Sequence, residues 1–87
     1  MSNRYKLTNE AIEIDGYVLH RIEALRDFGD IKKGEKGGFV EKEDNLTQDS
    51  NAWVFGYACV FGYACVFGDA KVYGDAKVYG DAEVYGE

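Results

Sequence analysis

The chain has 87 residues, of which 46% are hydrophobic, and this size supports one small domain with at most one core and a cap. Its net charge of −6 disfavours nucleic acid and anionic membranes as direct partners. No long apolar run follows the N-terminal residues, so we expect neither a signal peptide nor a membrane span, and we expect a cytoplasmic protein.

The first part of the chain indicates a β-hairpin. Residues 5–7 are a candidate short strand, and residues 11–15 alternate between apolar and acidic side chains. Asp15 and Gly16 form a tight-turn signal ahead of the apolar-rich residues 17–22. The alternative is a short helix over residues 9–14 or 22–26.

Between the hairpin and the repeats, residues 26–38 are rich in turn-forming Gly and Asp. Phe39 and Val40 then indicate a strand. Leu46 follows Val40 by six positions, the same interval that governs the rest of the chain. We therefore expect an imperfect first rung before the regular repeats begin.

Residues 51–86 consist of one six-residue unit that occurs six times, typified by Asp-Ala-Lys-Val-Tyr-Gly. Ala, Val and Gly always take even positions, so an extended chain would carry one small apolar face throughout. A meander of two-residue hairpins would set Val72 opposite Lys77 and mix core with solvent residues. A parallel coil with three units per turn instead stacks each Val on the Val eighteen positions later, as Val54 on Val72. The pattern favours the coil.

The spacing of Val and Ala carries a family likeness. A Val followed four positions later by Ala, as in Val54 with Ala58 and Val72 with Ala76, resembles the hexapeptide-repeat family of left-handed parallel β-helices. The left hand is implied by this resemblance alone, because right-handed crossovers are the general rule. Residues 27–54 resemble the leader of uncharacterised bacterial and prophage hexapeptide-repeat proteins.

Together these features predict an all-β chain with two parts. Residues 1–50 should form an N-terminal β cap or leader, and residues 51–87 a short left-handed parallel β-helix of about two coils. Two coils are few for a solenoid, and an uncovered coil end exposes unpaired strand edges. We therefore expect either that the gene is truncated or that another copy of the chain covers the open C-terminal end.

Enzyme chemistry finds little support in the residues. The family's acyltransferases, as the resemblance implies, use a histidine, and the only histidine here is His20, outside the repeats. A carbonic-anhydrase type of metal site would need about three histidines. The two cysteines occupy equivalent places in neighbouring repeats and should remain unbridged thiols. We expect no catalytic residue, no metal and no cofactor, and an acyltransferase remnant is the minor alternative.

The outward positions of the first coil are almost wholly apolar, which monomeric proteins rarely expose. Either the N-terminal cap covers them, with stacked aromatic pairs such as Phe55 on Tyr73, or another protein does. The sequence therefore predicts a non-enzymatic structural or interaction module that forms a homo-oligomer through this aromatic face or its open C-terminal end. The candidate interface anchors are Trp53, Phe55, Tyr57, Phe61, Tyr63 and Phe67.

A second hypothesis rests on the acidic turns of the later repeats. A small acidic protein with a prophage-like leader could be an inhibitor that binds a host defence or nucleic-acid enzyme by presenting carboxylates in place of phosphates. The candidate residues are Asp69, Asp75, Asp81, Glu83 and Glu87. Solvated turns are the simpler interpretation, and six-residue spacing sends the three aspartates to different corners, which disfavours a calcium site.

Overall fold

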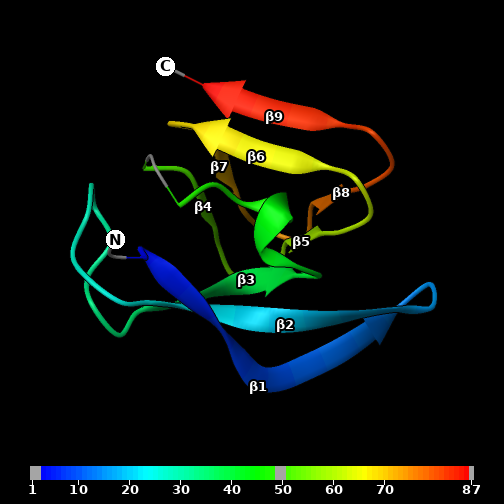
Figure 1. The fold of residues 1–87 in the computed structure, drawn as a ribbon, viewed down its shortest axis with the longest axis horizontal. Helices are drawn as coiled ribbons and strands as arrows, with labels where there is room; N and C mark the ends of the chain where they lie inside the picture. Colours follow the sequence, from blue (N-terminus) through cyan, green and yellow to red (C-terminus); the bar gives the residue numbers. More distant parts are fainter. Residues whose placement is uncertain (1–2, 49–50, 87) are drawn as a thin grey trace.

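The computed structural model describes residues 3–48 and 51–86, and in this part the regular secondary structure consists of β-strands and one short 3-10 helix (Figure 1). The elements are β1 (Tyr5–Ile14), β2 (Tyr17–Ala24), β3 (Lys36–Val40), the 3-10 helix η1 (Glu43–Asn45), β4 (Trp53–Val54), β5 (Cys59–Val60), β6 (Cys65–Gly68), β7 (Lys71–Val72), β8 (Lys77–Val78) and β9 (Glu83–Gly86). Among the described residues, no helical segment has the length and apolar content that a bilayer crossing needs.

The predicted hairpin is confirmed. Strands β1 and β2 pair antiparallel with Ile14 opposite Tyr17. Asp15 (φ 51°) and Gly16 (φ 88°) both adopt the left-handed conformation that a two-residue hairpin turn of type I′ requires. The helical alternatives are wrong, because residues 9–14 belong to β1 and residues 22–24 to β2. Alternating side chains and the Asp-Gly turn outweigh any local helical tendency.

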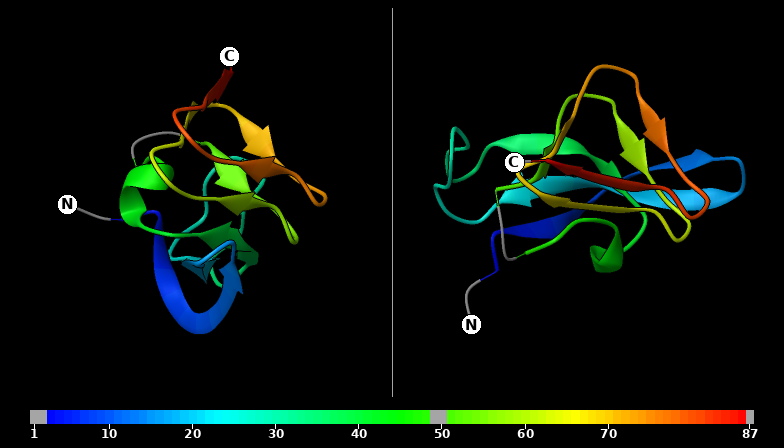
Figure 2. Two further views of the ribbon diagram at one scale, coloured as in Figure 1. Left: turned by 90° about the vertical axis from the view of Figure 1, so that its right-hand side faces the viewer. Right: turned by 90° about the horizontal axis from the view of Figure 1, so that it is seen from above.

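The repeats form parallel pairs at the predicted interval of eighteen residues. Val54 lies beside Val72 in the β4–β7 pair, and the β5–β8 and β6–β9 pairs repeat this register. The meander of hairpins is therefore excluded. Each of the first five units ends in a glycine with positive φ that turns the corner, for example Gly62 with φ 70°. Seen from the side of β9, the second coil traces a three-sided outline (Figure 2).

The leader continues two of the three coil faces. Strand β3 pairs antiparallel with β2 on one side and parallel with β5 on the other, with Val40 beside Val60. An isolated parallel bridge joins Leu46 to Val66. Both leader contacts span twenty residues instead of eighteen, because two extra residues separate Leu46 from the first regular repeat. The prediction of an imperfect first rung is confirmed.

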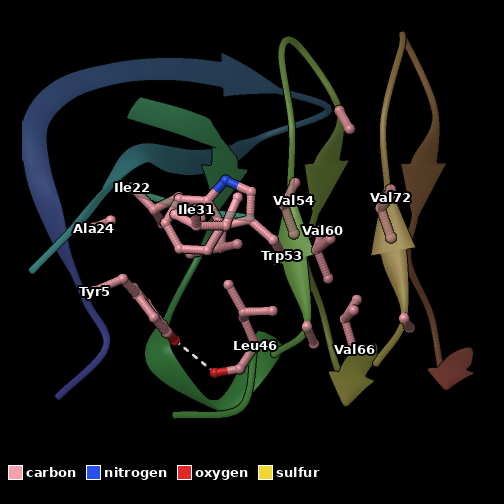
Figure 3. Packing of buried hydrophobic residues seen from close by; sticks show 14 of the residues in the cluster. Tyr5, Ile22, Ala24, Ile31, Leu46, Trp53, Val54, Val60, Val66 and Val72 are labelled. Atoms are coloured by element: carbon pink, nitrogen blue, oxygen red, sulfur yellow. Dashed lines mark hydrogen bonds between the residues drawn. The ribbon is translucent and has the colours of Figure 1, made fainter. Parts of the chain in front are cut away.

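One hydrophobic core runs through the leader and the first coil. It includes Tyr5 and Ile22 from the leader as well as Val54, Val60 and Val66 from the repeats (Figure 3). The even-numbered core predicted for the first coil is confirmed, since its alanines and valines are all buried. In the second coil the corresponding positions become progressively accessible. The reason is that β7, β8 and β9 are each the last strand of their sheet.

Candidate functional site

Trp53 is not the outward-facing anchor that the sequence predicted. Its side chain is fully buried, with 0% exposure. The ring packs edge-on against Tyr5 at a centroid distance of 6.3 Å and against Phe28 at 5.4 Å. Although Trp53 points away from the coil interior, the leader folds over this face and encloses it. This correction removes Trp53 from any surface that a second protein could reach.

Phe61 requires the same correction, because only 3% of its surface is exposed. It belongs to a second cluster with Leu19, Phe39 and Cys59, formed where the β1–β2 hairpin and β3 lie against the next coil face. The Tyr17 ring lies 5.0 Å from the Phe61 ring. The leader therefore covers two faces of the first coil. This is the alternative in which the N-terminal cap, and not another protein, covers these outward residues.

The remaining candidate anchors keep part of their surface. Tyr57 and Tyr63 are 69% and 77% exposed, Phe67 is 38% exposed, and Phe55 is half-buried. Two of them make cation–π contacts with charged side chains of the leader. The Arg21 guanidinium is 5.6 Å from the Tyr57 ring centroid, and the Lys42 ammonium is 4.9 Å from that of Tyr63. These two tyrosines thus form the rim between leader and repeats.

The aromatic residues at the fifth position of each repeat contact one another from coil to coil, but Phe55 meets Tyr73 edge-on, at an interplanar angle of 85°, and is not stacked on it as expected. The pairs are Phe55–Tyr73, Phe61–Tyr79 and Phe67–Tyr85. The last two are nearly parallel, with interplanar angles of 11° and 19°. All three pairs end in a tyrosine that is more than 60% exposed. Phenylalanine therefore occupies the first coil and tyrosine the second, where the ring edge meets water.

The second coil presents an open end with unpaired strand edges. Backbone N–H groups of Cys59 and Phe61 donate to Ala76 O at 2.9 Å and Val78 O at 3.0 Å. Successive residues of a strand direct their backbone groups to opposite sides. Lys77 therefore directs its N–H and C=O groups away from the first coil, toward the open end, whereas Tyr79 O already accepts a hydrogen bond from Ala82 N at 3.3 Å. The same alternation holds along β7 and β9.

Apolar core positions lie beside these edges. Ala76 and Ala82 are exposed, and Val78 and Val84 are half-buried. In the first coil the equivalent alanines and valines are fully covered by the second coil. The open end, defined here as β7, β8 and β9 with these four side chains, combines accessible apolar surface with strand edges. This combination is typical of a surface that receives another polypeptide.

The acidic candidates lie on the second coil. Asp69, Asp75, Asp81 and Glu83 are all exposed, and the three aspartates follow different corner glycines. Glu87 lies outside the described residues. Within residues 3–48 and 51–86, no three His, Cys, Asp or Glu side chains lie close enough together to hold a metal ion. The aspartates therefore do not converge, as their spacing predicted.

The histidine and the two thiols have local structural partners. His20 is half-buried, and its Nδ1 lies 3.1 Å from Thr8 O, so this nitrogen carries the proton because a carbonyl only accepts. Cys59 and Cys65 are free thiols, as expected. Burial raises the pKa of Cys59, and the nearby Lys77 ammonium partly opposes this shift. A raised pKa disfavours the reactive thiolate.

Sequence reasoning placed the tyrosines of the second coil at outward positions but did not name them as interface candidates. It placed the candidate interface on the first coil, whereas Tyr73, Tyr79 and Tyr85 are the aromatic side chains that the second coil exposes. The change from Phe to Tyr along the repeats was the available signal, because a phenol tolerates water better than a phenyl ring.

No family profile matches the chain. A curated protein described as "Uncharacterized acetyltransferase YdcK", from Escherichia coli (strain K12), is 32% identical to it over 60 residues. This similarity covers 60% of the present chain and 18% of that protein, so the chain spans less than a fifth of its relative. The likeness is distant and is consistent with the hexapeptide-repeat family.

Proposed function

We propose that this chain is a non-enzymatic structural module that self-associates through its open end. The observation that carries the proposal is the coincidence of three edge strands with accessible core positions at one end of the coil. Pairing with a second copy would satisfy the edge N–H and C=O groups and bury Ala76, Val78, Ala82 and Val84 together. Main-chain hydrogen bonds would supply affinity, and apolar burial would add to it.

The fold proposed for the repeats is a left-handed parallel β-helix of about two coils. The eighteen-residue register and the glycine corners support it. Viewed from the open end, the chain runs clockwise as it comes toward the viewer, which is the sense of a left-handed coil (Figure 2, right). The distant similarity to a protein named as an acetyltransferase agrees with the hexapeptide-repeat resemblance.

In this proposal residues 1–50 act as the cap for the repeats in residues 51–87. Support comes from β3 and Leu46, which pair with β5 and β6 on the side of the first coil opposite the open end. The leader also encloses Trp53 and Phe61 on two outer faces. These contacts leave the second coil as the end available for association.

Light scattering with two matched variants tests the proposal. Ala82→Glu introduces a carboxylate at the open end, where the side chain is exposed, so the monomer should keep its stability to within about 0.5 kcal/mol. Ala11→Glu places the same charge on the exposed hairpin, far from the open end. The wild type and Ala11→Glu should associate as concentration rises, and Ala82→Glu should remain a single chain. A wild type that stays monomeric at the highest concentration would refute the proposal.

Acyl transfer is the second candidate, and the name of the similar Escherichia coli protein is the observation that favours it. His20 would be the residue to supply proton transfer, but its Nδ1 is engaged by Thr8 O. The test is thioester turnover by the wild type and by His20→Ala. Turnover that disappears in the variant, while its fold is unchanged, would establish this function in place of the structural one.

A further inference from the structure

We infer that the self-association is a closed two-fold dimer in which open end meets open end and β8 pairs antiparallel with β9 of the second copy. This inference rests on the proposed function and specifies its geometry. It predicts a discrete dimer, and it assigns Lys77 and Glu83 as the charged pair that sets the register between the two copies.

The first argument is that the two ends of the coil differ. On the leader side, β5 already pairs with β3, and Val66 already pairs with Leu46. An ideal Cβ at Gly38 would lie 2.6 Å from Val54 Cγ1, which shows how tightly the leader lies against the first coil. A second copy cannot add there, so head-to-tail growth is blocked. Contact of like end with like end is isologous and closes on itself.

The outer edge of the leader, formed by β1, is poorly suited to pairing. Strand β1 lies at the edge of its sheet, but its register is interrupted between Leu7 and Ala11. Lys6 and Glu10 place charges along this edge, and Glu10 is already engaged by Arg21 at 3.0 Å. Bulges and charges are features that protect edge strands from association. Between residues 69 and 86 the open end shows no such interruption of its ladders.

A two-fold axis between two open ends reverses every strand, so the strands of the two copies meet antiparallel. Antiparallel pairing is at least as stable per residue as the parallel pairing inside the coil. The axis passes through the middle of one coil face, so this face contacts the same face of the second copy. Each of the other two faces contacts the other one in the second copy. The even-numbered apolar positions remain inside in each of these arrangements.

Charge at the third repeat position selects among the three arrangements. These residues are Lys71 on β7, Lys77 on β8 and Glu83 on β9. An axis through β9 would place Glu83 on itself and Lys71 on Lys77, so every contact would join like charges. An axis through β7 or β8 instead brings Glu83 to a lysine of the second copy.

Existing ion pairs separate the two remaining arrangements. The Lys71 ammonium lies 3.8 Å from the Asp30 carboxylate, so its charge is partly neutralised where it meets Lys71 of the second copy. Within the described residues, Lys77 and Glu83 form no ion pair. An axis through β7 therefore places β8 against β9, with Lys77 directly opposite Glu83 of the second copy or one diagonal step from it. Long side chains span either separation.

The corner aspartates oppose this arrangement and limit its strength. An axis through β7 brings Asp75 near Asp69 of the second copy and brings Asp81 near its own equivalent. These carboxylates are exposed, so solvent reduces their repulsion and added salt screens it further. Added salt screens the attraction between Lys77 and Glu83 in the same way, so the charges select the arrangement more than they set its affinity.

Charge reversal tests the inference on the full chain. Lys77→Glu and Glu83→Lys should each weaken dimerisation about tenfold, because each dimer contains the pair twice. The double variant Lys77→Glu/Glu83→Lys should regain wild-type affinity. The matched control is Lys71→Glu/Glu83→Lys, which should not regain it. Dissociation constants would come from sedimentation equilibrium, with circular dichroism to confirm that each variant is folded.

Failure of the inference is distinguishable from failure of the proposed function. A monomeric wild type overturns both. A wild type that forms trimers or open-ended assemblies retains self-association and overturns the closed dimer. A dimer whose affinity returns in the Lys71 control, or in neither double variant, overturns the pairing of β8 with β9.

Discussion

Replacing Gly38 with Ala should disrupt the contact between the leader and the first coil. An added Cβ would lie 2.5 Å from Ala58 O and 2.6 Å from Val54 Cγ1. Neither neighbour can move easily, since Ala58 O accepts a hydrogen bond from Phe39 N at 2.9 Å and Val54 is fully buried. Overpacking costs about 1–3 kcal/mol, and two such contacts place the expected loss near the upper limit, at about 3 kcal/mol of the free energy of unfolding.

Urea unfolding followed by tryptophan fluorescence measures this loss. Trp53 is the only tryptophan of the chain, and it lies between leader residues and the repeats, so its emission reports their separation. In a domain of this size, the loss corresponds to a melting temperature lower by roughly 12–24 °C. The size of the measured loss depends on whether β3 lies as close to the first coil as the distances from Gly38 to Ala58 and Val54 indicate.

Gly16→Ala is the matched control. No atom lies within 4 Å of a Cβ at Gly16, whose φ is 88°, so the cost there is only that of a left-handed backbone, about 1 kcal/mol. If Gly38→Ala destabilises the protein no more than Gly16→Ala, steric contact with the first coil is not the reason for glycine in β3, and the packing argument is refuted.

Three further predictions concern the buried groups. Burial, reinforced by two nearby carboxylates, raises the pKa of Tyr5 above its ordinary 10.0, so its contribution to stability is complete below pH 10 and is lost as the pH rises further. Tyr5→Phe should remove this alkaline dependence and cost about 1 kcal/mol at neutral pH, as urea titrations at several pH values would show. Asn45→Ala removes three hydrogen bonds to backbone groups and should cost about 3 kcal/mol in the same assay, whereas a loss under about 1 kcal/mol would contradict this accounting. Phe61→Ser should cost about 3–5 kcal/mol and Tyr63→Ser less than about 0.5 kcal/mol, because their exposures are 3% and 77%; similar melting temperatures would contradict the assigned burial.

Local and periodic features of the sequence predicted most of the backbone arrangement. The hairpin followed from Asp15 and Gly16, which specify a turn through their own conformational preferences. The coil register followed from the repeat, because six is an even number and the two faces of the chain never exchange. Pairing Val54 with Val72 is then the arrangement that keeps all small apolar side chains on one side.

The surface could not be predicted in the same way. Trp53 and Phe61 occupy outward positions that the repeat assigns to solvent or to a partner. Their burial depends on Tyr5, Phe28 and Phe39, residues far away in the chain whose spacing carries no periodic signal. Predicting that the leader would enclose these faces requires knowing how it crosses them.

The sequence by itself therefore determined which side of each repeat faces the core and which residues stack, because those properties follow from a side-chain period of two and a repeat of six. The tertiary structure decided how the leader lies against the first coil and which outward aromatics are buried. These outcomes depend on contacts between segments far apart in the chain, such as the pairing of Val40 with Val60 and the hydrogen bond from the Tyr5 hydroxyl to Leu46 O, visible in Figure 3. Such contacts are set by the total packing of the chain and leave no local pattern in its sequence.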